Sequence, residues 1–451
     1  MYLLNGDGLA QWWRQDWTVP QPWGPMWLGG GGRTPTEDER IDDAVTVSRT
    51  GGAMYLYDRA LTGIAEEQGA YRSVQRLYPH YPLGEPVGPP KGLVLLDHFQ
   101  SPKQPDPTTP GRFVTGPVAK LDVKDMNPGF VDANDQLITD TSGAGLQACL
   151  HKLITTQFRN YLSSPQNTAP SAGDRLRVAL VDLTGAKIAQ PEFAGWGSTV
   201  SMYGASVPKI LALYGAHQLR MDLRQLAASQ SISAGKTLEQ AALRAWTLKS
   251  NLPNLAWLFD IRHWSGDPSA LDFTPAARTV FEGIMHNAEA GELITKVGFP
   301  YIASVAWQSG LYHPTRRGLW LTSSYGKGQW GSNPMKNVYS ANATALSAAT
   351  YFTLLAQGRL VDDASSREIT STLAGGCFSG LFPESLGLVA SKCGIWSDYL
   401  HDCALIVRDS VRYVVIGLTR TKRSEYSTYT QLFLELDKLI VRNNQTPKPA
   451  C

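Results

Sequence analysis

The sequence predicts an α+β fold, in which an antiparallel β-sheet is flanked by N- and C-terminal helices and carries an inserted all-α subdomain. Three observations predict it. Amphipathic helical periodicity occurs at residues 146–162 and 426–441, strand-like apolar runs occur near residue 180 and after residue 387, and the stretch between those runs is mainly helical. Because a sheet and its helices bury their apolar faces against one another, these segments describe one layered domain.

The regular pattern begins with a helix and a pair of strands. Apolar residues recur at helical spacing from Leu146 to Leu162. The run RVALVD at 177–182 is typical of a strand, Thr184-Gly185 is typical of a turn, and residues 186–189 begin the predicted return strand.

The remaining elements follow from the same signals. Residues 206–344 are mainly helical, and a further helix is predicted at 343–357. Three β-rich segments follow at 387–392, 403–408 and 412–419, before the closing helix. We therefore expect a domain over residues 141–446, with an α/β part at 141–205 and 345–446 and a helical part at 206–344.

Residues 1–140 differ in composition from the rest of the chain. Fifteen of the 28 prolines lie before residue 130, together with a glycine run at 29–32 and five tryptophans, at positions 12, 13, 17, 23 and 27. Proline and glycine interrupt regular structure, whereas tryptophans are seldom left in water. We expect a loop-rich extension docked on the following domain, either beside its cleft or on the far side of its sheet.

Charge and hydropathy exclude several classes of protein. With 41 Lys plus Arg against 39 Asp plus Glu, the chain carries no basic excess of the kind that binds nucleic acid. Its apolar runs are shorter than the ~20 residues of a membrane span. As written, residues 1–15 lack the pattern of an export signal, which indicates a cytoplasmic protein, or a periplasmic or secreted one if a signal was removed.

The five cysteines are scattered, at positions 149, 377, 393, 403 and 451. This spacing is typical neither of a disulfide framework nor of a zinc site, so we expect no metal and mostly reduced thiols.

A Ser-x-x-Lys pair at the start of an apolar helix is the first candidate for chemistry. Ser206 and Lys209 are three residues apart, so a helix places both on one face, where a neutral amine can accept the hydroxyl proton. Pro208 is tolerated only in a first turn, which fixes where the helix begins. The N–H groups of that turn favour negative charge on an attacking oxygen. The alternative is a serine N-cap beside a solvated lysine.

Two later segments place this pair in a context. Ser250 and Asn251 follow it, and Lys392-Cys393-Gly394 ends a predicted strand. In this order, the segments resemble the Ser-x-x-Lys, Ser-x-Asn and Lys-Thr-Gly motifs of the penicillin-binding-protein and serine β-lactamase superfamily, especially class A. The resemblance covers roughly residues 141–446 and implies a β-lactamase/transpeptidase-like fold.

The resemblance also implies catalytic roles. Ser206 would be the nucleophile and Lys209 its general base, and Ser250 would relay a proton to the leaving group. Lys392 would line the opposite wall, help keep Lys209 neutral and attract a substrate carboxylate. The alternative for Lys392 is a cross-strand lysine on the surface.

Further residues would bind the substrate. The backbone N–H groups of Ser206 and Ile395 would form the oxyanion hole. Gly394 fits this arrangement because a side chain there would obstruct the substrate. His401 lies just beyond this strand and is a candidate for the site or for a structural role. Trp330, with Trp307 and Trp396, is a candidate for an aromatic wall or for the core.

Three departures from the family pattern affect the expected activity. The asparagine of Ser-x-Asn is displaced to Asn251 or Asn254, and Cys393 replaces a threonine hydroxyl that binds the substrate carboxylate. No Asp or Glu occurs from Trp307 to Val361, where a class A enzyme carries its deacylating glutamate. We therefore expect no efficient class A β-lactam hydrolysis.

The sequence thus predicts a serine hydrolase that forms an acyl-enzyme on a small-molecule or peptide amide or ester, without a cofactor. Two alternatives remain open. One is a β-lactamase or D-Ala-D-Ala peptidase of the cell envelope, and the other is a catalytically inactive binding protein with the same fold. Oligomeric state is not readable from the sequence.

Overall fold

A computed structural model describes residues 46–50, 53–57, 104–105, 113–114, 127–131, 137–139, 145–245, 253–298, 301–302, 305–306, 309, 311–313, 317–319, 321, 342–374, 387–421 and 425–447. Before residue 127 these are two short antiparallel hairpins, β1 (Thr46–Thr50) with β2 (Ala53–Tyr57) and β3 (Gln104–Pro105) with β4 (Phe113–Val114). The five tryptophans of the extension lie outside the described residues, so its docking stays a prediction.

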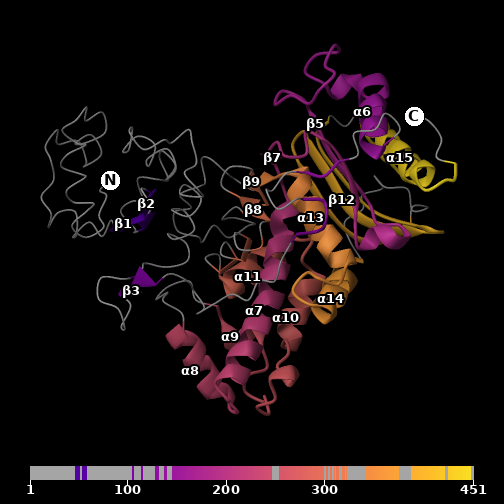
Figure 1. The fold of residues 1–451 in the computed structure, drawn as a ribbon. Coiled ribbons are helices and arrows are strands. Elements are labelled where there is room, and N and C mark those ends of the chain that lie inside the picture. Colours follow the sequence, from indigo (N-terminus) through magenta and orange to yellow (C-terminus); the bar gives the residue numbers. More distant parts are fainter. Residues whose placement is uncertain are drawn as a thin grey trace, which may run out of the picture.

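A five-stranded antiparallel sheet forms the centre of the domain (Figure 1). Its strands, in spatial order, are β11 (Leu388–Trp396), β12 (Tyr399–Arg408), β13 (Val411–Arg420), β5 (Leu176–Asp182) and β6 (Glu192–Trp196). All seven residues of β5 are buried, as expected for an apolar run covered on both faces. The pairing of β13 with β5 joins the two ends of the domain, since about two hundred residues separate these strands in the sequence.

Two terminal helices cover one face of the sheet. They are α6 (Leu146–Gln157) and α15 (Tyr426–Asn443), and Figure 1 shows them side by side against the strands. On β12, Leu400, Ala404 and Ile406 point into the core that these helices share. The helix–sheet–helix arrangement confirms the predicted fold class.

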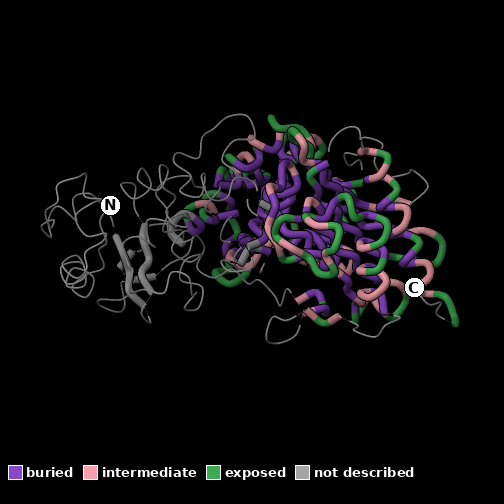
Figure 2. Tube along the Cα trace, turned by 90° about the horizontal axis from the view of Figure 1, so that it is seen from above, coloured by how far each residue is buried: buried purple, intermediate pink, exposed green. Residues whose placement is uncertain are grey.

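The alternate residues of β12 face the second core. Cys403 and Leu405 pack there with α13 (Ala345–Ala356) and with the helical part of the domain. Buried residues therefore line both faces of the sheet and the helices that cover it (Figure 2). Successive side chains of a strand point to opposite faces of the sheet, so a sheet covered on both faces contributes alternate residues to two cores.

The helical part lies between β7 (Met202–Tyr203) and β10 (Asn342–Ala343), which pair with each other. Its helices are α7 (Ile210–Ser229), α8 (Gly235–Ala245), α9 (Leu255–Leu258), α10 (Pro275–Glu282) and α11 (Asn287–Val297). A further helix, α14 (Asp363–Ala374), follows α13 in the sequence. Helix α7 is buried on nearly all sides, so it forms the axis around which the others pack. Short strands β8 (Tyr312–His313) and β9 (Arg317–Gly318) form a further hairpin.

Three local predictions need correction. The expected return strand at 186–189 is a 3-10 helix, η3 (Gly185–Ile188), because Gly185 takes a positive φ of 59° that turns the chain before β6 begins at Glu192. The first helix ends at Gln157 and is followed by a 3-10 turn, η2 (Arg159–Tyr161). Helix α14 was not predicted.

The prediction of mostly reduced thiols is wrong for two of the cysteines that the structure describes. Cys149 and Cys393 each take part in a disulfide, whereas Cys403 is a free, buried thiol. The spacing of the five cysteines matches no disulfide framework, so it gave no signal for these bonds.

Candidate active site

Ser206 lies at a sharp turn between the short strand β7 and the long helix α7. The chain enters α7 through a 3-10 turn, η4 (Val207–Lys209), in which Val207 N–H donates to Gly204 O at 2.9 Å and Pro208 occupies the first turn. Ala205 has a φ of 45°, a conformation that costs energy for a residue with a side chain. Ser206 is the N-cap residue, but its hydroxyl makes no capping hydrogen bond. The N-cap alternative therefore has no support.

The turn is held against the sheet by His401. Nδ1 of His401 accepts a hydrogen bond from Thr419 N–H at 3.1 Å, so Nε2 carries the proton and donates to Tyr203 O at 2.7 Å. Burial lowers the pKa of His401 to about 4, so the ring is neutral. Because the side chain is fully buried and both nitrogens are engaged, the geometry gives His401 the structural role and leaves the substrate-binding one without support.

Lys209 is fully buried rather than a solvated surface lysine. Its Nζ donates to Met285 O at 3.0 Å and to Asn287 Oδ1 at 2.8 Å, both at the start of α11. Burial lowers the pKa of Lys209 to about 8, against the opposing effect of the Glu289 carboxylate. A substantial fraction of the amine is therefore neutral near pH 8, which is the form that can accept a proton.

Lys392 lies on β11, the edge strand of the five-stranded sheet, and is also buried. Its Nζ donates to Cys393 O at 2.6 Å. Burial and the positive charge of Lys209 lower the pKa of Lys392 to about 7, while Cys403 and Asp402 act in the opposite direction. The two lysines thus share one electrostatic environment, and the surface-lysine alternative for Lys392 is wrong.

Gly394 brings the edge strand into contact with the Ser206 turn. A Cβ at Gly394 would lie 2.7 Å from Gly204 O and 3.1 Å from Ser206 N, too close for any side chain. The next residue, Ile395, has an exposed side chain. Its backbone N–H as half of an oxyanion hole remains a prediction.

The remaining residues of β11 alternate between the two faces of the sheet. Lys392 and Gly394 share the face that meets the Ser206 turn, so Cys393 between them lies on the other face, opposite Asp402. The predicted role of Cys393 at the position of the family's threonine stays a prediction. Trp396 at the end of the strand is 65% exposed, which makes it a surface side chain at the rim rather than a core residue.

Four predicted residues lie outside the part of the chain that the structure describes: Ser250, Asn251, Trp307 and Trp330. Asn254 is described, and its side chain caps α9 by accepting from Trp257 N–H. The asparagine that contacts Lys209 is instead Asn287, which sequence reasoning missed. The available signal was an asparagine at the first position of an amphipathic helix. Met285, two residues before Asn287, accepts a hydrogen bond from Lys209 through its backbone carbonyl oxygen, and its side chain has no hydroxyl.

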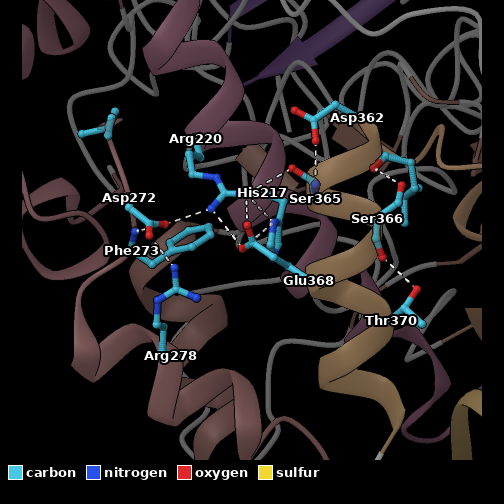
Figure 3. A network of polar contacts seen from close by, with 12 residues as sticks. His217, Arg220, Asp272, Phe273, Arg278, Asp362, Ser365, Ser366, Glu368 and Thr370 are labelled. Carbon is cyan, nitrogen blue, oxygen red and sulfur yellow. Dashed lines mark hydrogen bonds and ion pairs between the residues drawn. The ribbon is translucent and has the colours of Figure 1, made fainter. Parts of the chain in front are cut away.

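A polar network joins α7 to the elements packed around it (Figure 3). Arg220, which is almost fully buried, donates from both terminal nitrogens to Glu368 of α14, at 3.0 and 3.1 Å, and to Asp272 at 3.0 Å. Its guanidinium also stacks over the ring of Phe273. The bidentate pair with Glu368 joins α7 to α14, and the bond to Asp272 joins α7 to the segment before α10. These contacts limit movement of α7, which begins directly after Lys209.

Within the described part of the chain, no cluster of His, Cys, Asp or Glu could hold a metal ion. Among the same residues, no helix is both long and apolar enough to cross a membrane.

Comparison with known proteins supports one family over part of the chain. Residues 290–442 match the family model described as the beta-lactamase enzyme family. This match confirms the resemblance to the penicillin-binding-protein and serine β-lactamase superfamily over these residues. No curated protein sequence matches the chain.

Several solved structures are similar at low identity. A β-lactamase from Sphaerobacter thermophilus is 14% identical, with 67% of this chain and 97% of that chain covered and a TM-score of 0.40. A class A β-lactamase from Mycobacterium abscessus is 14% identical over 66% and 98%, with a TM-score of 0.38. The protein PBP-A is 12% identical over 64% and 94%, with a TM-score of 0.37. At these scores, the superpositions add nothing to what the chain's own strand order shows.

Proposed function

We propose, from the match of residues 290–442 to the beta-lactamase enzyme family, that this protein is a serine hydrolase that forms an acyl-enzyme on Ser206. Its substrate is an amide or ester of a peptide or small molecule. Lys209 serves as the general base, and the turn at the start of α7 supplies the surroundings of the nucleophile.

The observation that carries the proposal is the state of Lys209. The amine is three residues from Ser206, fully buried, and hydrogen-bonded to Met285 O and Asn287 Oδ1. Burial lowers its pKa to about 8, so it can be neutral under mild conditions. A buried lysine with no chemical task is costly to keep, which favours a catalytic explanation over a structural one.

The proposed reaction follows from these positions. Ser206 Oγ attacks the substrate carbonyl carbon while its proton passes to Nζ of neutral Lys209. The oxyanion is held by the backbone N–H groups of Ser206 and Ile395. Collapse of the tetrahedral adduct breaks the amide or ester bond, the leaving group takes the proton, and water later releases the acyl group.

Ser250, the predicted relay for the leaving-group proton, lies outside the described residues, so that role stays a prediction. Met285 O accepts from Lys209, and the Met285 side chain has no proton to give. Among the described residues, Lys209 can donate a proton to the leaving group once it has taken the proton of Ser206. Lys392 is the second amine close enough to interact electrostatically with Lys209.

One observation favours the second candidate, a β-lactamase or D-Ala-D-Ala peptidase of the cell envelope. Cys149 and Cys393 each take part in a disulfide. Disulfides persist mainly in oxidising compartments such as the periplasm. The envelope candidate and the general hydrolase share the same acyl-enzyme and differ in the substrate.

Active-site labelling tests the proposal. A fluorophosphonate should add covalently to the wild-type protein, and peptide mapping by mass spectrometry should place the adduct on Ser206. The Ser206→Ala variant should not be labelled. Equal labelling of both proteins, or an adduct on another serine, would exclude Ser206 as the nucleophile.

A further inference from the structure

Glu289 lies in the first turn of α11, two residues after Asn287. A Cβ on Gly283, the residue that ends α10, would lie 2.6 Å from Cγ and 3.3 Å from Cδ of Glu289. The φ of Gly283 is −87°, which any residue adopts, so its backbone does not require glycine. The absent side chain therefore provides the space in which the Glu289 side chain lies.

One oxygen of the Glu289 carboxyl group lies inside the protein without a hydrogen bond to any described residue. Its Oε2 is buried and has no hydrogen-bond partner within the described part of the chain. A buried carboxylate oxygen without a donor costs free energy unless a nearby positive charge compensates it. The same turn, residues 285–289, supplies both hydrogen-bond acceptors of Lys209, Met285 O and Asn287 Oδ1.

We propose that Glu289 is a positioning residue of this site, whose carboxylate balances the charge that Lys209 gains when it takes the proton of the attacking serine. The proposal rests on the proposed function. In the step concerned, the Oγ–H bond of Ser206 breaks, an N–H bond forms on Lys209, and a C–O bond forms to the substrate. Glu289 makes and breaks no bond in this step and acts only through Lys209.

Among the described residues, the other charges around Lys209 do not replace Glu289. Lys392 approaches from β11 and adds positive charge to the same environment. Asp402 and Cys403 of β12 act on Lys392, and His401 is neutral because burial lowers its pKa to about 4.

Glu289 is the group that raises the pKa of Lys209 against the effect of burial. The alternative role for Glu289 is to stabilise the N-terminus of α11 through the helix dipole.

The pH dependence of Ser206 acylation separates these roles. In the wild type, the acylation rate should fall as the pH drops below about 8, because Lys209 becomes protonated. In Glu289→Gln, the midpoint of this limb should move to lower pH and the plateau rate at high pH should also fall, since Lys209 becomes a weaker base. Glu289→Asp, which keeps the charge, should restore part of both changes.

Gly283→Ala provides a matched variant that leaves the carboxylate in the chain. Its new Cβ should displace Glu289 and shift the midpoint in the same direction as Glu289→Gln, by a smaller amount. If Glu289→Gln lowers the thermal stability but leaves the midpoint and plateau unchanged, the carboxylate serves only the helix and the proposal is overturned.

A direct titration keeps the test independent of activity. The ¹³Cε resonance of Lys209, assigned by comparison with Lys209→Met, should titrate at lower pH in Glu289→Gln than in the wild type. An unchanged titration overturns the role of Glu289 even if Ser206 is labelled normally. A wild-type protein that shows this titration shift but no acylation of Ser206 would instead contradict the proposed function.

Discussion

At the scale of single residues, the two buried lysines are the most informative feature of the site. Lys209 and Lys392 are almost wholly removed from water, and their pKa values are lowered to about 8 and about 7. Because both amines are buried and their positive charges repel each other, simultaneous protonation of the two lysines is unfavourable. Each lysine should therefore affect both the chemistry and the stability of the protein.

Replacing Lys209 tests its role as the base. Lys209→Ala should slow acylation of Ser206 by roughly 10² to 10⁴-fold, the range for a positioned acid or base. The rate is measured by quenched intact-mass spectrometry with a fluorophosphonate or penicillin. Lys438→Ala on α15, where the side chain is 61% exposed, is the control and should leave the rate unchanged. Equal rates in Lys209→Ala and the control would remove Lys209 from the mechanism.

Replacing Lys392 separates stability from activity. In the folded state the pKa of Lys392 is lowered, so folding opposes protonation and the charged form destabilises the protein below about pH 7. Between that value and the ordinary lysine pKa, the unfolded chain binds more protons, so the contribution of Lys392 to stability improves as the pH rises.

Lys392→Met should accordingly raise the free energy of unfolding at neutral pH by about 1 to 4 kcal/mol while impairing acylation. Urea denaturation at pH 6.5 and at pH 9 checks this, and the gain should be larger at the lower pH. A loss of stability at both pH values would show that the Lys392 amine is held by favourable interactions.

Among the contacts between elements, we expect the pair of Arg220 on α7 and Glu368 on α14 to have a large coupling energy. Arg220 is 3% exposed in its side chain, whereas Glu368 is 35% exposed, and they form a bidentate pair. A double-mutant cycle with Arg220→Ala and Glu368→Ala, followed by urea denaturation, should give a coupling of about 1 to 3 kcal/mol.

The control for this cycle lies on α14 itself. Arg367 and Asp363 form an ion pair one turn apart, with side chains 70% and 68% exposed. Their coupling should be about 0.5 kcal/mol or less, as for other solvated helix pairs. If the two cycles give similar values, burial of Arg220 adds nothing and the network does not hold α7 in place.

Elements with strong local signals could be predicted from the sequence. The apolar run at 177–182 and the β-rich segments after residue 387 became β5 and β11 to β13, and the periodic segments became α6 and α15. The 3-10 helix at 185–188 could not be predicted, because its four residues carry no periodicity and the turn depends on the conformation of Gly185.

At the scale of the whole molecule, the site forms where distant segments meet. Ser206 and Lys209 start the helical part, Asn287 starts a later helix, and Lys392 and Gly394 come from the edge strand of the sheet. The motif order indicated the first and last of these. The middle one could not be predicted, because Asn287 follows Met285 and His286 instead of a serine motif, and only folding brings it to Lys209.

The central claim is that Ser206 forms a covalent acyl-enzyme, and intact mass spectrometry after incubation with a penicillin tests it most directly. Because residues 307–361 contain no Asp or Glu that could promote deacylation, we expect one stoichiometric adduct on the peptide that contains Ser206, released slowly. The adduct should be absent in Ser206→Ala. Absence of any adduct in the wild type, or an adduct that persists in Ser206→Ala, would contradict the claim.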